Sequence, residues 1–159
     1  RRLTVASYAL DFELSTIGTL PRTIHTMTLK NVLCGLDVNF QDMVSLTKLD
    51  FTGDHLPLGL VLPTRLRILK LSVRNITQQY CTAGQILSSL PNHLAYLVLE
   101  SPIGVNYDVG DEHVSKLPNS LTAMTLSDCR LTAKCLAVLP SNLRQLRVGL
   151  SRPVWWTRK

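Results

Sequence analysis

The sequence predicts an α/β solenoid, in which a curved parallel sheet forms the concave face and helical or irregular segments form the convex face. The first observation is a pattern, L-P-x-x-L-x-x-L-x-L, that recurs along the 159-residue chain. The second is its spacing, because the last apolar residues of successive copies are 20 residues (Phe51 to Leu71) to 28 residues (Leu71 to Leu99) apart. The third is the composition: 45% of the residues are hydrophobic and 18% are charged, which excludes a disordered chain.

Seven copies of the pattern follow one another. Five contain the Leu-Pro pair: LPRTIHTMTL, LPTRLRILKL, LPNHLAYLVL, LPNSLTAMTL and LPSNLRQLRV, which end at Leu29, Leu71, Leu99, Leu126 and Val148. The segment MVSLTKLDF keeps the apolar spacing without Leu-Pro and ends at Phe51. The segment LTV, which ends at Val5, matches the tail of one further copy.

The L-x-L end of each copy predicts a short strand with one buried face, because apolar and variable residues alternate there. A strand of this length cannot bury its apolar side alone. Strands stacked about 4.8 Å apart would form a parallel sheet and join their leucines into one core. Parallel strands need crossover connections, and the roughly 15 residues between the copies supply them.

Three connecting segments carry helix signals. The segment that starts at Thr77 puts four residues on one helical face: Tyr80, Ala83, Leu87 and Leu90. The segment that starts at Thr132 opens with a suitable N-cap, and we expect Leu136 and Leu139 to point inward. The segment GDEHVSKLP has acidic residues in its first turn. The segment HLPLGLVLP is too short and too rich in proline and glycine for a helix.

The motif and its spacing resemble those of leucine-rich repeats, whose core motif is L-x-x-L-x-L-x-x-N/C-x-L and whose units span about 20–29 residues. The resemblance covers residues 1–159, so we expect a single array of about seven units, and a fragment of a longer protein because the chain starts at Arg1. At the family's Asn/Cys position only Cys129 is of the expected type. The other residues at that position are Tyr8, Val32, Asp54, Arg74, Pro102 and Ser151. We therefore expect an irregular array without an asparagine ladder.

The sequence shows no common catalytic or nucleotide-binding motif, such as G-x-G-x-x-G, G-x-x-x-x-G-K-[ST], H-E-x-x-H or G-x-S-x-G. The four histidines and four cysteines are scattered, which does not indicate a metal site. The acidic stretch DVGDEH lacks the spacing of a calcium loop and favours a solvated insertion before a helix N-terminus. We expect no enzymatic activity, no cofactor, no metal and no small-molecule substrate.

The scattered cysteines favour an intracellular, cytoplasmic location in which they stay reduced. No apolar run reaches about 18 residues, so we expect no membrane-spanning segment. The sequon at residues 75–77 would matter only in a secreted protein.

The net charge is +6, and basic residues concentrate near the C-terminus. From residue 130 onward no acidic residue occurs, and the basic residues are Arg130, Lys134, Arg144, Arg147, Arg152, Arg158 and Lys159. Such a block could attract nucleic acid or an acidic protein surface. These residues alternate with core leucines rather than with stacking aromatic residues, which weighs against nucleic acid.

In a repeat array the variable residues around the strands form the concave surface. We predict that a partner binds at its middle, through Lys48, Asp50, Ile68, Lys70, Tyr96, Val98 and Glu100. An aromatic residue, aliphatic residues and both charges together are typical of a protein interface. Ile68 and Val98 are also explained by β-propensity alone.

We therefore expect a non-enzymatic module that recognises another protein on its concave face. Two settings follow from the resemblance: the substrate-recognition part of an F-box-type ubiquitin-ligase receptor, or that of a microbial effector. The alternative is a nucleic-acid-binding solenoid that uses the basic C-terminal units. Trp155 and Trp156 either cap the open end of the array or belong to an interface.

Overall fold

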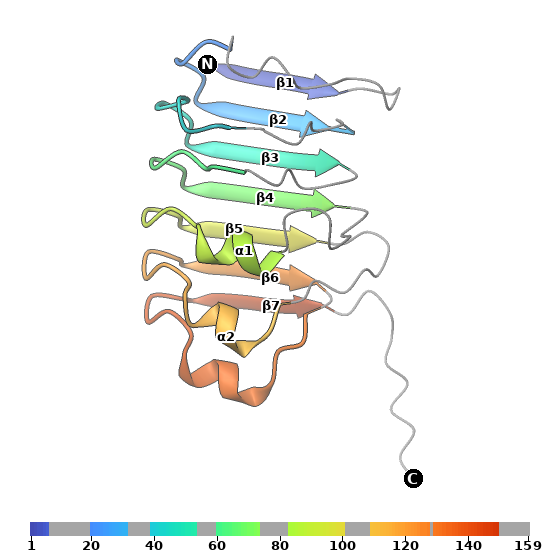
Figure 1. The fold of residues 1–159 in the computed structure, drawn as a ribbon, viewed down its shortest axis with the longest axis vertical. Helices are drawn as coiled ribbons and strands as arrows, with labels where there is room; N and C mark the ends of the chain where they lie inside the picture. Colours follow the sequence, from blue (N-terminus) through green and yellow to red (C-terminus); the bar gives the residue numbers. More distant parts are fainter. Residues whose placement is uncertain are drawn as a thin grey trace.

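The computed structural model describes residues 1–6, 20–31, 39–53, 60–73, 83–100, 109–127 and 129–149. In this part of the chain, seven strands form one parallel sheet whose order follows the chain, as Figure 1 shows. The strands are β1 (Arg2–Ala6), β2 (Thr26–Lys30), β3 (Lys48–Gly53), β4 (Ile68–Val73), β5 (Tyr96–Glu100), β6 (Ala123–Ser127) and β7 (Gln145–Gly149). The predicted solenoid with a parallel sheet is confirmed.

The register of the sheet places equivalent residues of the repeat side by side. The last apolar residues of the seven copies form one row: Val5, Leu29, Phe51, Leu71, Leu99, Leu126 and Val148. Every second residue of β3 and β4 is buried, because alternate side chains of a strand point to opposite faces. The sequence alignment of the copies therefore predicted the register correctly.

A tight turn built on Pro-x-x-Leu precedes most strands. The amide of Leu66 donates a hydrogen bond of 3.1 Å to the carbonyl of Pro63. The equivalent amides, which bond in the same way to the prolines three residues before them, are those of Ile24, Leu94, Leu121 and Leu143. Proline suits the first position because its φ is already restricted and its nitrogen needs no acceptor.

The copy without Leu-Pro folds into the same turn. Met43 stands at the proline position, and its carbonyl accepts from the amide of Leu46 at 2.9 Å. The amide of Met43, which a proline would lack, donates to the carbonyl of Phe40 at 3.0 Å. The turn therefore depends on the spacing of the apolar residues, and proline is one of several residues that fit it.

Backbone hydrogen bonds connect the turns in a column. The carbonyl of Thr47 accepts from the amides of Arg67 and Ile68 at 2.9 and 3.0 Å, and each neighbouring pair of copies repeats this arrangement. The column consists of Arg1, His25, Thr47, Arg67, Ala95, Thr122 and Arg144. These residues mark the edge of the sheet at which the strands begin.

In the described part of the chain, three short helices lie on the inner side of the sheet. They are α1 (Ala83–Ser88), α2 (Asp111–Val114) and the 3-10 helix η2 (Ala133–Ala137). α1 contacts α2, and α2 contacts η2. Leu87 is buried, as predicted. The α2 helix carries Asp111 and Glu112 in its first turn, also as predicted.

The prediction that Leu136 points inward is wrong. Its side chain is 65% exposed, whereas the neighbouring Cys135 is buried and Leu139 packs partly against the core. The hydroxyl of Thr132 accepts from the amide of Lys134, so the predicted cap is present. The segment forms a 3-10 helix with about three residues per turn, and this tighter winding gives the inward position to Cys135.

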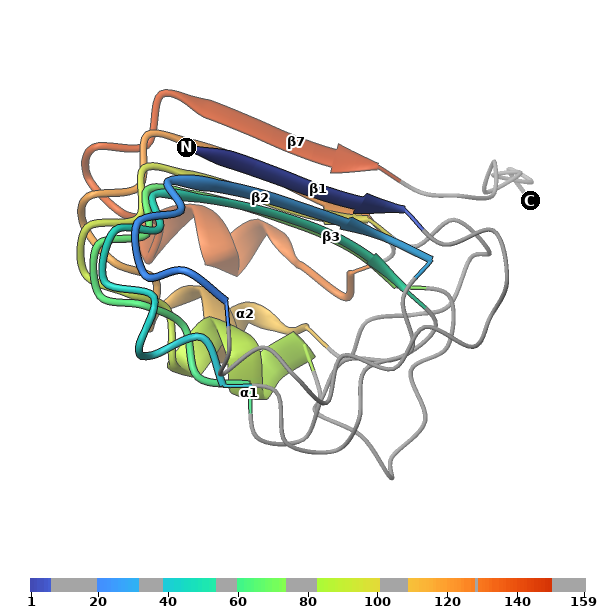
Figure 2. The same ribbon diagram turned by 90° about the horizontal axis from the view of Figure 1, so that it is seen from above.

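The outer face of the sheet is concave. Figure 2, seen along the stack, shows β1 and β7 displaced from β2 and β3 toward the side opposite the helices. The strands therefore line the concave side, as predicted. No helix in the described part of the chain is long and apolar enough to cross a membrane.

Several sequence predictions lie outside the described residues. They concern residues 77–82 of the predicted helix, the sequon at residues 75–77, the pair Trp155 and Trp156, and most residues at the family's Asn/Cys position. Cys129 is described and is half-buried, and its Sγ donates to the carbonyl of Ser127 at 3.4 Å.

Candidate functional site

The outer face of β3, β4 and β5 carries all seven residues predicted to bind a partner. Alternation directs these side chains away from the leucine core, and the register brings them together. Six of them form two rows across the three strands. The first row is Lys48, Ile68 and Tyr96, and the second is Asp50, Lys70 and Val98. Glu100 lies two residues beyond Val98 on β5. The structure thus gathers residues that span more than fifty positions of the sequence, roughly two repeats, into one patch.

A groove of about 380 Å³ runs across this face. Five of the predicted residues line it: Asp50, Lys70, Tyr96, Val98 and Glu100. Lys48 and Ile68 are not among the lining residues. The other lining residues are Lys30, Thr52, Leu71, Ser72, Thr125 and Arg147.

The sequence prediction missed part of the groove for an identifiable reason. Lys30, Thr52 and Ser72 follow the last apolar strand residue of their copies, and in register they form a third outward row that ends at Glu100. Reading that third position down the repeats would have found them. Arg147 lies between the apolar strand residues Leu146 and Val148, in the last copy, whereas the predicted patch covers only the central copies.

Lys70 and Tyr96 form the centre of the groove. Lys70 Nζ lies 5.9 Å from the centroid of the Tyr96 ring. The two residues are diagonal neighbours on adjacent strands, which is within reach for long and aromatic side chains. A cation–π contact at an exposed site contributes about 0.5–1 kcal/mol. The contact therefore holds the ammonium group over the ring.

Val98 forms part of the groove floor. It is 7% exposed, although it occupies an outward position between Lys70 and Thr125 in the register. A short branched side chain on a concave sheet is covered by its longer neighbours. Any contribution of Val98 to binding would come from the shape of the floor rather than from a large contact area.

The groove carries charges of both signs. Lys30, Lys70 and Arg147 contribute three positive charges, while Asp50 and Glu100 contribute two negative charges. Asp50 pairs with Lys70 in register, but within the described ranges no ion pair joins the two. The Lys70 ammonium group is instead placed over the aromatic ring. The Asp50 carboxylate can therefore meet a cationic group of a partner.

The described residues offer little for metal or nucleophilic chemistry. They contain no cluster of three His, Cys, Asp or Glu side chains that could hold a metal ion. His25 and His93 are both exposed, and His25 Nδ1 lies 3.1 Å from the carbonyl of Ser45. Burial raises the pKa of the Cys135 thiol, and the nearby charge of Asp111 acts in the same direction. This thiol is therefore protonated at neutral pH, which disfavours a nucleophilic role.

The described part of the acidic stretch DVGDEH has a structural role. Gly110 is the N-cap of α2, and the Asp111 carboxylate accepts hydrogen bonds from the backbone amide (2.9 Å) and the hydroxyl of Thr132. These bonds, the hydroxyl bond first, lower the pKa of Asp111. Asp111 therefore connects α2 to the start of η2, in agreement with the predicted helix N-terminus. Asp108 lies outside the described residues.

No family model matches this sequence, and a search of curated proteins finds no match.

Proposed function

We propose that this chain is a leucine-rich-repeat module that recognises another protein on its concave face, without enzymatic activity. The observation that carries the proposal is the groove across the outer face of the sheet, centred on Lys70 and Tyr96. The leucine-rich-repeat assignment is supported by six copies of the apolar spacing of L-x-x-L-x-L, by the tail of a seventh copy at Val5, and by the parallel register of the strands.

The shape of the groove favours a macromolecular ligand over a small molecule. Its lining extends from Lys30 on β2 to Arg147 on β7, which is five strand spacings or about 24 Å. Small-molecule sites typically enclose most of their ligand in an apolar pocket. A long groove of mixed polarity instead suits a peptide segment or the surface of a folded protein.

The side chains in the groove favour protein over nucleic acid. Single-stranded nucleic acid is usually bound by several exposed aromatic residues along a basic track. Tyr96 is the one aromatic residue that lines the described groove, and the Lys70 ammonium group already lies over its ring. Asp50 and Glu100 would repel phosphates.

The nucleic-acid alternative requires exposed basic residues in the C-terminal copies, and Arg144 and Arg147 are exposed. Salt titration against generic DNA and RNA tests that alternative.

The wider setting stays a prediction. The substrate-recognition part of a ubiquitin-ligase receptor and that of a microbial effector both use a recognition surface of this kind. Each would need a partner domain outside this chain. The intracellular, cytoplasmic location also stays a prediction, which rests on the scattered cysteines.

A peptide-display selection tests the proposed function. Peptides that bind the protein are isolated from a random library, and their affinities are measured for the wild type and for the Lys70→Ala, Tyr96→Ala double variant. We expect the selected peptides to share a motif and to bind the double variant about tenfold or more weakly, as is typical at an interface hot spot. Lys134→Ala, on the exposed side of η2, is the matched control and should bind normally.

Two results would contradict this proposal. Selected peptides could share no motif, or they could bind the double variant as well as they bind the wild type. Because both residues lie on the outer face, the double variant should keep its unfolding transition. Circular dichroism during thermal unfolding checks that it does.

A further inference from the structure

The edge of the sheet at which the strands begin is strongly basic. We call this edge the entry rim and define it as residue 1 together with the turns at residues 20–25, 42–47, 62–67, 90–95, 117–122 and 139–144. Its exposed charged residues are five arginines and one aspartate: Arg1, Arg22, Arg65, Arg67, Arg144 and Asp42. The difference is four positive charges, which is most of the chain's net charge of +6.

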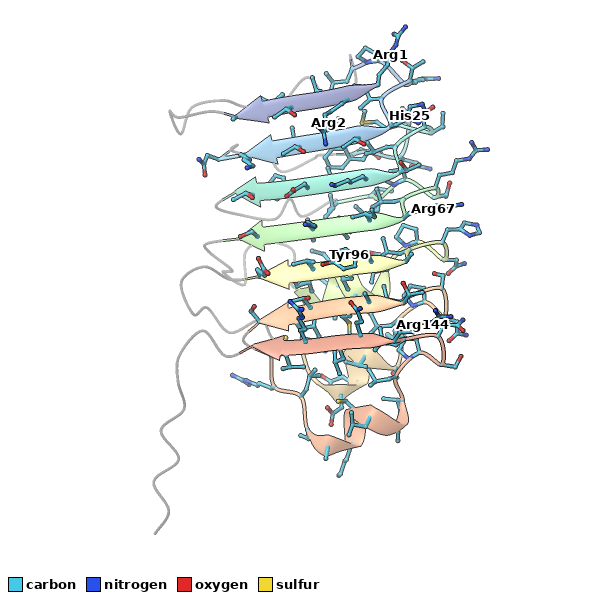
Figure 3. All side chains as sticks on the ribbon, turned by 180° about the vertical axis from the view of Figure 1, so that it is seen from behind. Arg1, Arg2, His25, Arg67, Tyr96 and Arg144 are labelled. Carbon is cyan, nitrogen blue, oxygen red and sulfur yellow. The ribbon has the colours of Figure 1, made fainter. Side chains whose placement is uncertain are left out.

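Three of these arginines are equivalent in the repeat. Arg1, Arg67 and Arg144 belong to the single backbone column that joins successive turns. They stand before β1, β4 and β7, so three strand spacings separate each from the next. At about 4.8 Å per spacing, neighbouring arginines of the column are about 14 Å apart. Figure 3 shows Arg1, Arg67 and Arg144 along one edge, while Tyr96 lies on the face of the sheet.

We propose that the entry rim binds an acidic segment of the protein partner in an extended conformation, with carboxylates every fourth residue facing Arg1, Arg67 and Arg144. This inference rests on the proposed function in protein recognition. An extended chain rises about 3.4 Å per residue, so four residues cover about 14 Å. Four is an even number, and the carboxylates therefore project from the same side of the segment.

A helical ligand fits this spacing less well. At about 1.5 Å per residue, side chains on one helix face recur after seven residues (about 10.5 Å) or eleven residues (about 16.5 Å). Neither distance matches the arginine spacing. The exposed guanidinium group of each arginine can form a bidentate ion pair with a carboxylate. This favours a ligand whose carboxylates have the same spacing as the arginines.

The entry rim is less suited to nucleic acid. Asp42 lies on the turn before β3, between the positions of Arg1 and Arg67, where a continuous phosphate backbone would have to pass. None of the turns that form the rim contains Phe, Tyr or Trp, so bases would have no stacking platform there. A peptide can place an uncharged or basic residue opposite Asp42.

Two synthetic peptides of identical composition test the inference. One has three glutamates at every fourth position in a background of serine and threonine, and the other has them at every third position. Binding is measured by fluorescence anisotropy at low ionic strength, where charge screening is weak. We expect the first peptide to bind more tightly, and Arg67→Glu to weaken it about tenfold, because the substitution replaces attraction by repulsion.

A charge-matched control separates local recognition from general attraction. Lys134→Glu changes the net charge by the same amount on η2, away from the rim, and should alter the affinity less than about twofold. Equal weakening by Lys134→Glu, or equal binding of the two peptides, would overturn the inference. Tighter binding of an RNA or DNA oligonucleotide than of either peptide, lost in Arg67→Glu, would overturn it in favour of nucleic acid.

The peptides isolated by display distinguish failure of this inference from failure of the proposed function. If those peptides require Lys70 and Tyr96 but bind the Arg67→Glu variant normally, the concave face recognises protein and the entry rim does not. If the glutamate peptide depends on Arg67 while no isolated peptide depends on Lys70 and Tyr96, the rim binds acidic segments and the groove has no part in recognition.

Discussion

Asp111 is the residue that most directly joins two convex segments. Its carboxylate accepts two hydrogen bonds from Thr132, and the positive charge of Lys134 lies close enough to act on it. All three interactions favour the ionised carboxylate and exceed the opposing effect of burial, so the pKa lies below its ordinary value of 3.8. The stabilisation that Asp111 provides therefore depends on pH.

Asp111→Asn should remove this dependence. A carboxyl group with a lowered pKa in the folded state stabilises that state above the pKa of the unfolded chain, and the contribution disappears as the pH falls through the folded-state pKa. We expect the wild type to exceed the variant in free energy of unfolding at pH 7, and the difference to shrink below about pH 4. Urea unfolding at both pH values measures it. A difference that stays constant with pH would show that ionisation of Asp111 contributes nothing.

Packing between helices α1 and α2 depends on one close approach. A Cβ atom added at Gly84 would lie 2.3 Å from Nε2 of His113. The His113 ring is held in place because its Nδ1 accepts a hydrogen bond from the amide of Gly110 at 3.1 Å. Glycine is therefore required at this position by its neighbour and not by its own backbone.

Gly84→Ala should consequently destabilise the protein, although alanine is normally preferred in a helix by up to about 1 kcal/mol. We expect a loss of about 1–3 kcal/mol in the free energy of unfolding, which is typical of overpacking. In a His113→Ala background the same substitution should be neutral or stabilising. Chemical denaturation of the four proteins of this cycle measures both values. Equal effects in the two backgrounds would exclude the ring as the cause.

At the scale of the molecule, burial decreases from the middle of the stack to its ends. The inward side chains of β3 and β4 are buried, whereas those of β1 and β7 are at most half-buried and Val148 is 47% exposed. Each copy of a solenoid is stabilised mainly by its neighbours, and an end strand in the described stack has one neighbouring strand instead of two. The terminal copies should therefore open first.

Hydrogen exchange detected by mass spectrometry should show this gradient. We expect the slowest exchange in β3, β4 and β5 and the fastest in β1 and β7, because local opening follows local burial. Protection that is uniform across the seven strands would contradict this expectation and indicate that the stack unfolds as a single unit.

The candidate site could be predicted only in part from the sequence. Alternation around the strand leucines identified outward residues, and five of the seven selected residues line the groove. It did not identify the third outward row, which includes Lys30. Apart from Glu100, the predicted binding residues all precede the last apolar residue of their copy, and this row follows it. The prediction that Leu136 points inward was wrong because the sequence pattern did not distinguish an α-helix from a 3-10 helix. In the 3-10 helix the inward residue is Cys135.

The sequence by itself determined the seven strands, their register and the face on which each side chain lies. These features follow from local rules, because a strand alternates its side chains and stacked copies must align their leucines to bury them. Only the tertiary structure decided the position of Lys70 over Tyr96 and the closeness of His113 to Gly84. Each of these joins separate copies of the repeat, so its geometry depends on how neighbouring copies stack and curve.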